Sequence, residues 1–259
     1  MLVLLSPAKS LDYESSAQTS KYSEPEFLED SKELIHTLRD YSVDDLRGLM
    51  DISENLAVLN RERYHQFSTP FTTENAKQAI LAFDGDVYTD FQFQKYEEEH
   101  FSFLQDHVRI LSGLYGLLRP LDLMQPYRLE MGTSLKTDRG SNLYEFWGDK
   151  ITEAVNGALD AQGDDVLLNL ASNEYFKSIN KKKLNARMLD VKFKDLKNGK
   201  YRSISFYLKR LRGTMTDYMV RNQIQNPEEL KSFTEQNYYF SEQESSEDCF
   251  VFLRDEKPE

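Results

Sequence analysis

The sequence predicts an α/β protein: a single compact domain in which a mixed, partly antiparallel sheet is surrounded by helices. Three observations lead to this class. Apolar runs typical of buried strands begin at four places separated by helical patterns, near residues 2, 108, 166 and 188. The pair Asn198-Gly199 predicts a β hairpin late in the chain. No linker rich in Pro, Gly or Ser divides the sequence, so we expect one domain over residues 1–259.

The N-terminal third predicts one strand followed by helices. Residues 1–5 are apolar but too few for a signal peptide, so they predict a first strand. After a polar loop, apolar residues recur at three- and four-residue steps and predict helices that begin after Pro25, Ser42 and Ser53. The two serines are expected N-caps. A further helix is expected over residues 73–81.

The middle of the chain predicts two strands separated by an irregular loop. Residues 82–88 resemble a strand end followed by a turn, and residues 97–106 suit a short helix. Residues 108–111 predict a buried strand that turn residues end. Glycines and prolines over residues 113–126 predict a shaped loop rather than a helix. Residues 127–131 predict the next strand.

The last part of the chain predicts a helix, a buried strand and a hairpin. Asn142 begins a helix with one apolar face, and Gly163 ends it. Residues 166–172 form a continuous apolar run of the kind buried on both faces of a sheet. Strands over 188–193 and 201–206 flank the hairpin turn. The remaining expected elements are a helix and two aromatic strands, at 206–224, 238–240 and 249–253.

Charge is distributed unevenly along the chain. The net charge is −12, yet residues 177–212 hold thirteen Lys and Arg against two Asp, a local net charge of +11. A concentrated basic segment in an acidic protein indicates a binding surface for phosphates. The alternative is a solvated basic face that pairs with the acidic segments.

The stretch from Ile110 to Gly132 mixes glycines, prolines, tyrosines and arginines into an apolar segment. Gly113 and Gly116 allow a positive φ or a close approach of the backbone to a ligand, so their amides are candidate ligand contacts. Three polar side chains are expected to project from this loop: Arg119, Tyr127 and Arg128. The alternative is a structural crossover whose glycines serve turns and whose arginines form ion pairs.

Several familiar chemistries are disfavoured. The pair Ser6 and Lys9 has the spacing of a lysine-activated serine, but the companion motifs are absent. Nucleotide-binding glycine motifs are also missing. The four histidines and the single Cys249 lack metal spacing, so no metal or cofactor is expected, and a carboxylate iron or magnesium site is a minor alternative. One cysteine and no long apolar run predict a cytoplasmic protein without a membrane segment.

Polar or small residues follow four predicted strand ends, at Ser6, Asp84, Ser112 and Ser172. In α/β proteins, ligands bind in the crevice beyond the carboxyl ends of the strands. We therefore expect these four residues to converge on one cleft.

Long blocks of the sequence resemble the YaaA family of bacterial peroxide stress proteins. They follow one another across nearly the whole chain, at residues 4–13, 83–88, 110–132, 146–149, 169–177 and 204–207. Ser10 stands where the family commonly has Thr, which keeps a hydroxyl group. The resemblance implies a single-domain α/β fold with a basic cleft and a helix-hairpin-helix-like element. It also implies binding to double-stranded or locally melted DNA, and protection against hydrogen peroxide by limiting free iron and iron-driven DNA damage.

Two functional hypotheses follow. In a non-enzymatic DNA-binding stress protein, the expected nucleic-acid contacts are Lys9, Gly113, Gly116, Arg119, Arg128, Lys177, Lys181, Lys182, Lys183, Lys209, Arg210 and Arg212. In an enzyme that acts on a nucleotide or nucleic-acid base, the candidate catalytic residues are Ser6, Lys9, Glu130 and Glu174. Under both hypotheses the expected cleft lining is Ser112, Tyr115, Tyr127, Asn169, Ser172 and Tyr175. Direct iron binding is a third alternative, which the lack of His and Cys spacing disfavours.

Overall fold

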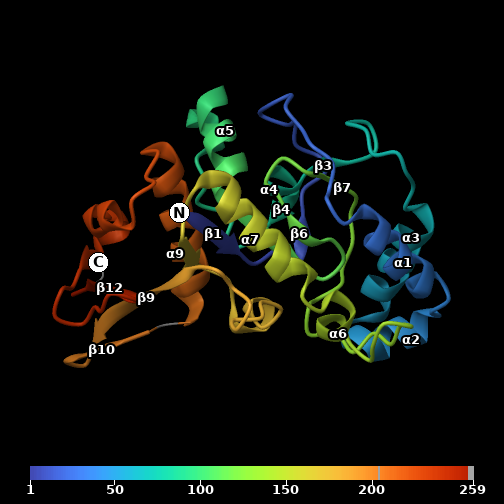
Figure 1. Ribbon diagram of the computed structural model, residues 1–259. Helices are drawn as coiled ribbons and strands as arrows, with labels where there is room; N and C mark the ends of the chain where they lie inside the picture. Colours follow the sequence, from blue (N-terminus) through green and yellow to red (C-terminus); the bar gives the residue numbers. More distant parts are fainter. Residues whose placement is uncertain (204, 256–259) are drawn as a thin grey trace.

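A mixed eight-stranded sheet runs through the protein, as a computed structural model shows (Figure 1). The structure describes residues 1–203 and 205–255. The strands along the sheet are, in spatial order, β11 (Tyr239–Phe240), β12 (Cys249–Arg254), β9 (Arg187–Lys197), β8 (Val166–Asn169), β1 (Leu2–Leu5), β5 (Val108–Ser112) and β6 (Gly116–Leu118). The strand β10 (Lys200–Arg202) pairs with β9. The five strands from β12 to β5 are parallel, whereas β6, β10 and β11 are antiparallel to their neighbours. The predicted α/β class with a partly antiparallel sheet is confirmed.

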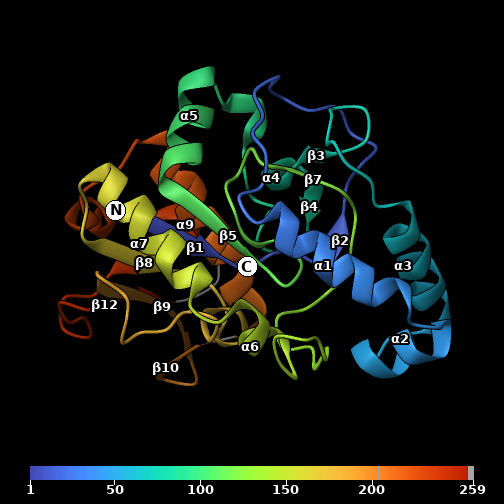
Figure 2. The same ribbon diagram turned by 45° about the vertical axis from the view of Figure 1, so that its right-hand side comes forward.

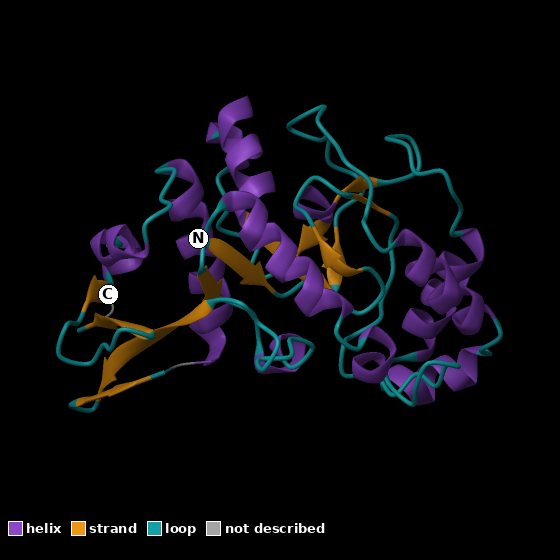
Figure 3. Ribbon diagram, in the orientation of Figure 1, coloured by secondary structure: helices purple, strands orange, loops and turns teal. Residues whose placement is uncertain are grey.

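Helices cover the sheet and form a separate group beside it (Figures 1 and 3). The helix α7 (Lys150–Gln162) crosses in front of β1 in Figure 1, and α9 (Ser205–Arg221) lies behind it. The group at the right of the view contains α1 (Leu28–Arg39), α2 (Val43–Met50) and α3 (Glu54–Gln66). The other α-helices are α4 (Ala79–Ala82), α5 (Glu98–His107), α6 (Leu143–Trp147) and α8 (Asn173–Phe176). Three 3₁₀ helices lie at Phe93–Lys95, Pro227–Ser232 and Glu235–Asn237. Within the described ranges, no helix is long and apolar enough to cross a membrane.

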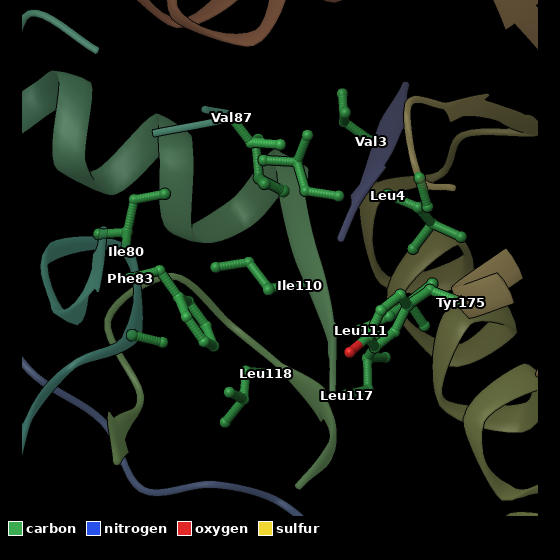
Figure 4. Close-up of a cluster of buried hydrophobic side chains, with 14 of the residues drawn as sticks. Val3, Leu4, Ile80, Phe83, Val87, Ile110, Leu111, Leu117, Leu118 and Tyr175 are labelled. Atoms are coloured by element: carbon green, nitrogen blue, oxygen red, sulfur yellow. The ribbon is translucent and has the colours of Figure 1, made fainter. Parts of the chain in front are cut away.

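The core lies on both faces of the central strands. All four residues of β1 are fully buried, as expected for a parallel strand covered on both sides. Ile110 of β5 packs with Ile80 and Phe83 on one side, whereas Leu111 lies near Tyr175 on the other (Figure 4). Figure 2 shows α5 and α7 on either side of these strands. The apolar runs of the sequence therefore become the buried centre of the sheet.

Two small two-stranded sheets lie outside the main sheet, and one of them replaces an expected helix. The helix expected over 73–81 is wrong, because Lys77–Gln78 forms a strand, β3, that pairs with β7 (Leu123–Met124), and only the single turn of α4 follows. Tertiary hydrogen bonds hold the extended backbone: Lys77 Nζ donates to the carbonyl oxygens of Asp12 and Ser15, both at 2.9 Å. The second small sheet pairs β2 (Ser10–Leu11) with β4 (Phe83–Asp84).

Two further corrections depend on glycines with positive φ. Gly116, at φ +68°, turns the chain back so that β6 pairs with β5, and no strand forms over the expected range 127–131. Gly148, at φ +51°, divides the helix expected from Asn142 into α6 and α7. Glycine adopts positive φ without the steric cost that a Cβ imposes, so each of these two glycines allows the element boundary at its position.

Most of the remaining elements follow their predictions. Asn198 and Gly199 both have positive φ, as a tight hairpin turn between β9 and β10 requires. The helix expected over 206–224 is α9, and the two aromatic strands are β11 and β12. The second hairpin strand ends at Arg202, earlier than the predicted 206, and residue 204 lies outside the described residues. The helix-hairpin-helix-like element stays unconfirmed.

Ser42 is the predicted N-cap of α2, and replacing it with alanine is expected to lower the free energy of unfolding by about 1 kcal/mol. Ser42 Oγ accepts a hydrogen bond from the Asp45 backbone N–H, and Asp45 Oδ2 accepts one from the Ser42 backbone N–H. Urea denaturation measures the loss. Ser16→Ala, in an exposed loop, is the control; equal stability of the two variants would contradict the cap.

Candidate functional site

A pocket of about 460 Å³ lies beyond the carboxyl ends of β1 and β8, and we call it the switch-point pocket. The chain leaves β1 toward β5 on one side and leaves β8 toward β9 on the other, so the strand order reverses between β1 and β8. Open α/β sheets bind ligands at this point. The residues that line the pocket are Ser6, Pro7, Ala8, Lys9, Ser10, Asp84, Gly85, Asp86, Val87, Glu130, Ser172, Glu174, Tyr175, Lys209 and Arg212.

Hydrogen bonds tie together the two loops that leave the sheet at the pocket. Ser6 Oγ accepts a hydrogen bond of 2.8 Å from the Ser172 backbone N–H. The Tyr88 hydroxyl donates to the Ser6 carbonyl oxygen at 2.9 Å. Lys9 Nζ lies 3.0 Å from Glu130 Oε1, and no hydrogen bond joins Lys9 to Ser6 in the ranges that the structure describes. Ser6 therefore holds the pocket's shape, and the arrangement is not that of a lysine-activated serine.

Three cations from two elements face this pocket. Lys9 follows β1 and its side chain is 63% exposed, whereas Lys209 and Arg212 lie one turn apart on α9. Burial lowers the pKa of the partly buried Arg212, and the nearby Asp190 acts in the opposite direction. The Arg212 side chain makes no hydrogen bond with the part of the protein that the structure describes. A desolvated guanidinium without such a partner is suited to bind an anion.

Carboxylates also line this pocket, and one of them pairs with Lys9. Glu130 Oε1 lies 3.0 Å from Lys9 Nζ and 3.1 Å from Arg128 Nη2, so one carboxylate oxygen serves two cations. Arg128 Nε is buried without a hydrogen-bond partner in the described residues. Glu174 Oε1 accepts a hydrogen bond of 3.0 Å from the Gly132 backbone N–H. The pocket is therefore polar and mixed in charge, with Asp84 and Asp86 on its lining.

The seating of α9 brings its two cations to the pocket. A Cβ atom on Gly213 would lie 1.7 Å from the Val87 carbonyl oxygen, so the helix packs directly on the backbone of the 85–88 loop. Arg210 donates to both carboxylate oxygens of Asp90, and this ion pair raises the pKa of Arg210. The close contact and the ion pair fix Lys209 and Arg212 relative to the 85–88 loop.

The structure brings together Ser6, Asp84 and Ser172, but it places Ser112 below the pocket. Ser112 Oγ lies 2.6 Å from the Tyr127 hydroxyl and accepts a hydrogen bond from the Tyr115 backbone N–H at 2.9 Å. All three of these residues are buried. The prediction that they line the cleft is therefore wrong for Ser112, Tyr115 and Tyr127, because their polar groups form hydrogen bonds with one another in the core.

Two other predicted residues, Asn169 and Tyr175, lie at the exit of β8 and differ in whether they reach the pocket. Asn169 donates to Asp190 Oδ1 at 3.0 Å and accepts from the Ala171 backbone N–H, so it shapes the exit of β8 without lining the pocket. Tyr175 does line the pocket, as predicted. Burial raises the pKa of Tyr175, which keeps its hydroxyl protonated.

The two glycines of the opening turn are structural. A Cβ on Gly113 would lie 2.2 Å from the Leu129 carbonyl oxygen, and one on Gly116 would lie 2.8 Å from the Trp147 ring. The Trp147 indole N–H donates to the Gly113 carbonyl oxygen at 3.0 Å. Both glycines are buried and serve turns and packing, and a contact of their amides with a ligand stays a prediction.

Several predicted phosphate contacts are already engaged within the protein. Lys183 binds Asp149 at 2.8 Å, Arg210 binds Asp90, and Arg119 binds Asp122 at 3.0 Å outside the switch-point pocket. Pairing of basic with acidic segments therefore holds for part of the basic stretch. Three other predicted phosphate contacts lie at the surface beside aromatic rings. Lys177 Nζ lies 4.7 Å from the Tyr144 ring centroid, and Lys181 Nζ lies 5.3 Å from the Phe176 ring centroid. Lys182, next to Lys181 in the sequence, is exposed.

Sequence reasoning missed some of the pocket residues. Ser10 and Val87 line the pocket but were absent from the expected site. Both lie in the sequence blocks that carry the family resemblance, and this signal could have identified them. Over the described residues, no three His, Cys, Asp or Glu side chains are grouped to hold a metal ion.

The fold and the pocket define a class: an open, doubly wound α/β protein with a polar pocket at its switch point. Comparison with protein families narrows this class. The family model described as peroxide stress protein YaaA matches residues 1–244. The chain belongs to this family, and the resemblance carried by its sequence blocks is confirmed.

Proposed function

We propose that this peroxide stress protein binds DNA, and that the switch-point pocket takes one nucleotide from a locally melted strand. The observation that carries the proposal is Arg212, a partly buried guanidinium that lines the pocket together with Lys9 and Lys209 and has no hydrogen bond within the described ranges. A volume of about 460 Å³ is that of a small-molecule site. It admits a single extruded nucleotide, whereas a duplex must stay outside.

The surface next to the pocket supports a path for the strand. The short helix α8 carries Glu174 and Tyr175 on the pocket lining, and Lys177 follows directly. The Tyr144 hydroxyl donates to the Glu174 carbonyl oxygen, which places an aromatic ring beside Lys177. Cations that contact phosphates along a strand provide affinity without reading its sequence. Lys177, Lys181 and Lys182 are therefore the proposed backbone contacts.

Protection against peroxide then follows from where the protein binds. Iron bound at DNA phosphates converts hydrogen peroxide into damaging species close to the bases. A protein that covers phosphates competes with iron for these positions, because its lysine and arginine side chains bind the same phosphate oxygens. We propose that cytoplasmic DNA binding of this kind lowers iron-driven damage, in keeping with the family's role in peroxide stress.

An enzyme that acts on a nucleotide or base is the second candidate, and Glu130 favours it. A pocket that only binds phosphate is weakened by carboxylates on its lining, yet Glu130 is held there by Lys9 and Arg128. A positioned carboxylate of this kind can serve as a general acid or base. The two candidates share the pocket and differ in what Glu130 does.

Glu130→Gln separates these two functions. For a DNA-binding protein, we expect the variant to bind a DNA bubble several-fold more tightly, because one negative charge leaves the pocket and Lys9 is freed. For an enzyme, product formation from oligonucleotides, followed by mass spectrometry, is expected to stop. Fluorescence anisotropy at low salt measures the affinity.

Glu228→Gln is the matched control, because it removes the same charge from an ion pair with Lys231 on a helix that does not line the pocket. Bubble binding that is undetectable at low salt, or that does not weaken as salt rises, would overturn the DNA-binding proposal.

A further inference from the structure

A second groove, of about 550 Å³, lies between α7 and the β5–β6 side of the sheet. Its lining residues are Glu26, Phe27, Arg109, Arg119, Lys150, Glu153, Ala154, Gly157 and Ala158. None of them lines the switch-point pocket. We call it the α7 groove, and neither the family match nor the proposed DNA binding gives it a role.

Arg109 is the fixed cation of the α7 groove. Its Nη1 donates to the carbonyl oxygens of Gln105 and Val108, both at 2.8 Å, and to that of Asp106 at 3.2 Å. Its Nε and Nη2 make no hydrogen bond with the described part of the chain. Burial lowers the pKa of Arg109, as does the neighbouring Arg119, whereas Asp122, Asp106 and Glu26 act in the opposite direction. The guanidinium is thus held rigidly and partly desolvated, and its Nε and Nη2 donors are available to an anion in the groove.

Buried carboxylates orient the other two cations. Asp122 binds Arg119 through Nε and Nη2, which leaves Arg119 Nη1 without a hydrogen bond in the described ranges. Asp30 binds Lys150 at 2.5 Å and is shared with Arg139 at 2.6 Å. Both carboxylates are buried. These two carboxylates therefore orient Arg119 and Lys150, while Arg139 is also paired with Glu33.

Gly157 leaves space in this groove because it has no side chain. It lies in the middle of α7, where glycine costs about 1 kcal/mol relative to alanine. A Cβ at this position would meet nothing within 4 Å, and its φ is not positive. Neither packing nor backbone geometry therefore requires this glycine, whereas a longer side chain there would project into the groove beside Ala154 and Ala158.

We propose that the α7 groove binds a small phosphorylated compound that also carries hydroxyl groups. Arg109 and Arg119 would bind the phosphate, since guanidinium groups match phosphate oxygens in pairs, and Lys150 would add a point charge. Glu26 and Glu153 on the same lining repel a phosphate but accept hydrogen bonds from hydroxyls. The volume is that of a small-molecule site.

Titration with ribose 5-phosphate, and separately with inorganic phosphate, tests this site. Nuclear magnetic resonance of the arginine Nε–H groups reports on Arg109 and Arg119 directly. We expect saturable shifts of both signals in the wild-type protein. In Gly157→Gln, which fills the groove and keeps every charge, we expect affinity for ribose 5-phosphate to fall about tenfold or more.

Gly48→Gln is the control, because Gly48 is also a helical glycine whose Cβ would meet nothing within 4 Å. The inference is overturned if the wild-type signals do not shift, or if Gly157→Gln binds as well as the wild type. The affinity of Gly157→Gln for bubble DNA shows whether the phosphate in the groove belongs to a free small compound or to DNA. An unchanged affinity for bubble DNA indicates a free small compound. A lowered affinity for bubble DNA indicates that the groove binds the DNA backbone. Arg212→Gln leaves this groove intact, so failure here is distinct from failure of the DNA-binding proposal.

Discussion

Gly213→Ala is expected to lower the free energy of unfolding by about 3 kcal/mol, because its Cβ would make the shortest contact of any glycine in this chain. The added Cβ would lie 1.7 Å from the Val87 carbonyl oxygen and 2.7 Å from its carbon. Both atoms belong to the backbone, so no side-chain rotation relieves the clash. Either α9 or the 85–88 loop must move. Chemical denaturation measures the loss of stability.

The same substitution is expected to weaken ligand binding, because Lys209 and Arg212 lie on α9 and Val87 lines the same pocket. Gly48→Ala is the matched control: this helical glycine has open space around it, and alanine there is expected to raise stability by up to about 1 kcal/mol. If Gly213→Ala were as stable as the wild type, the close packing of α9 on the 85–88 loop would be wrong.

Lys209→Gln combined with Arg212→Gln is expected to reduce the affinity for bubble DNA by at least about tenfold at ~0.1 M salt. Each lost phosphate contact also lowers the slope of log affinity against log salt by about 0.7 to 0.9. Anisotropy titrations at several salt concentrations measure the two quantities together. The slope matters more, since it reports the number of phosphates that the protein neutralises.

The control removes two lysines that do not line the switch-point pocket. Lys194 binds Glu244, and Lys231 binds Glu228 at 2.5 Å. The double variant Lys194→Gln and Lys231→Gln has the same net charge as the pocket variant. If the control lost as much affinity, net charge rather than the pocket would govern binding, and the pocket would not be the DNA site.

Much of the fold could be predicted from the sequence because its central strands are parallel and buried. Continuous apolar runs such as residues 2–5 and 166–168 have one stable environment, the middle of a covered sheet. Errors arose where distant partners decide the local structure. Residues 77–78 have no strand pattern of their own and become extended because β7 pairs with them. Local propensity cannot report such pairing.

The site was predictable in outline for a similar reason. The ends of parallel strands gather at one edge of a sheet, which brought Ser6 and Ser172 together as expected, whereas Asp84 reaches the same pocket from the small β2–β4 sheet. Ser112 differs because β5 continues into a hairpin with β6, and Tyr127 covers its hydroxyl. The distribution of charge along the chain does not say which carboxylates lie near each basic residue in the fold. The ion pairs of Lys183 with Asp149 and of Arg210 with Asp90 could therefore not be foreseen.

The position of β12 has a consequence for synthesis of the protein on the ribosome. This strand lies between β9 and β11 and pairs with β9 along six residues, and its Arg254 forms a buried ion pair with Asp195 at 2.6 Å. The sheet therefore receives an interior strand from the last part of the chain that the structure describes. Until β12 has emerged from the exit tunnel, one edge of β9 stays unpaired in the nascent chain.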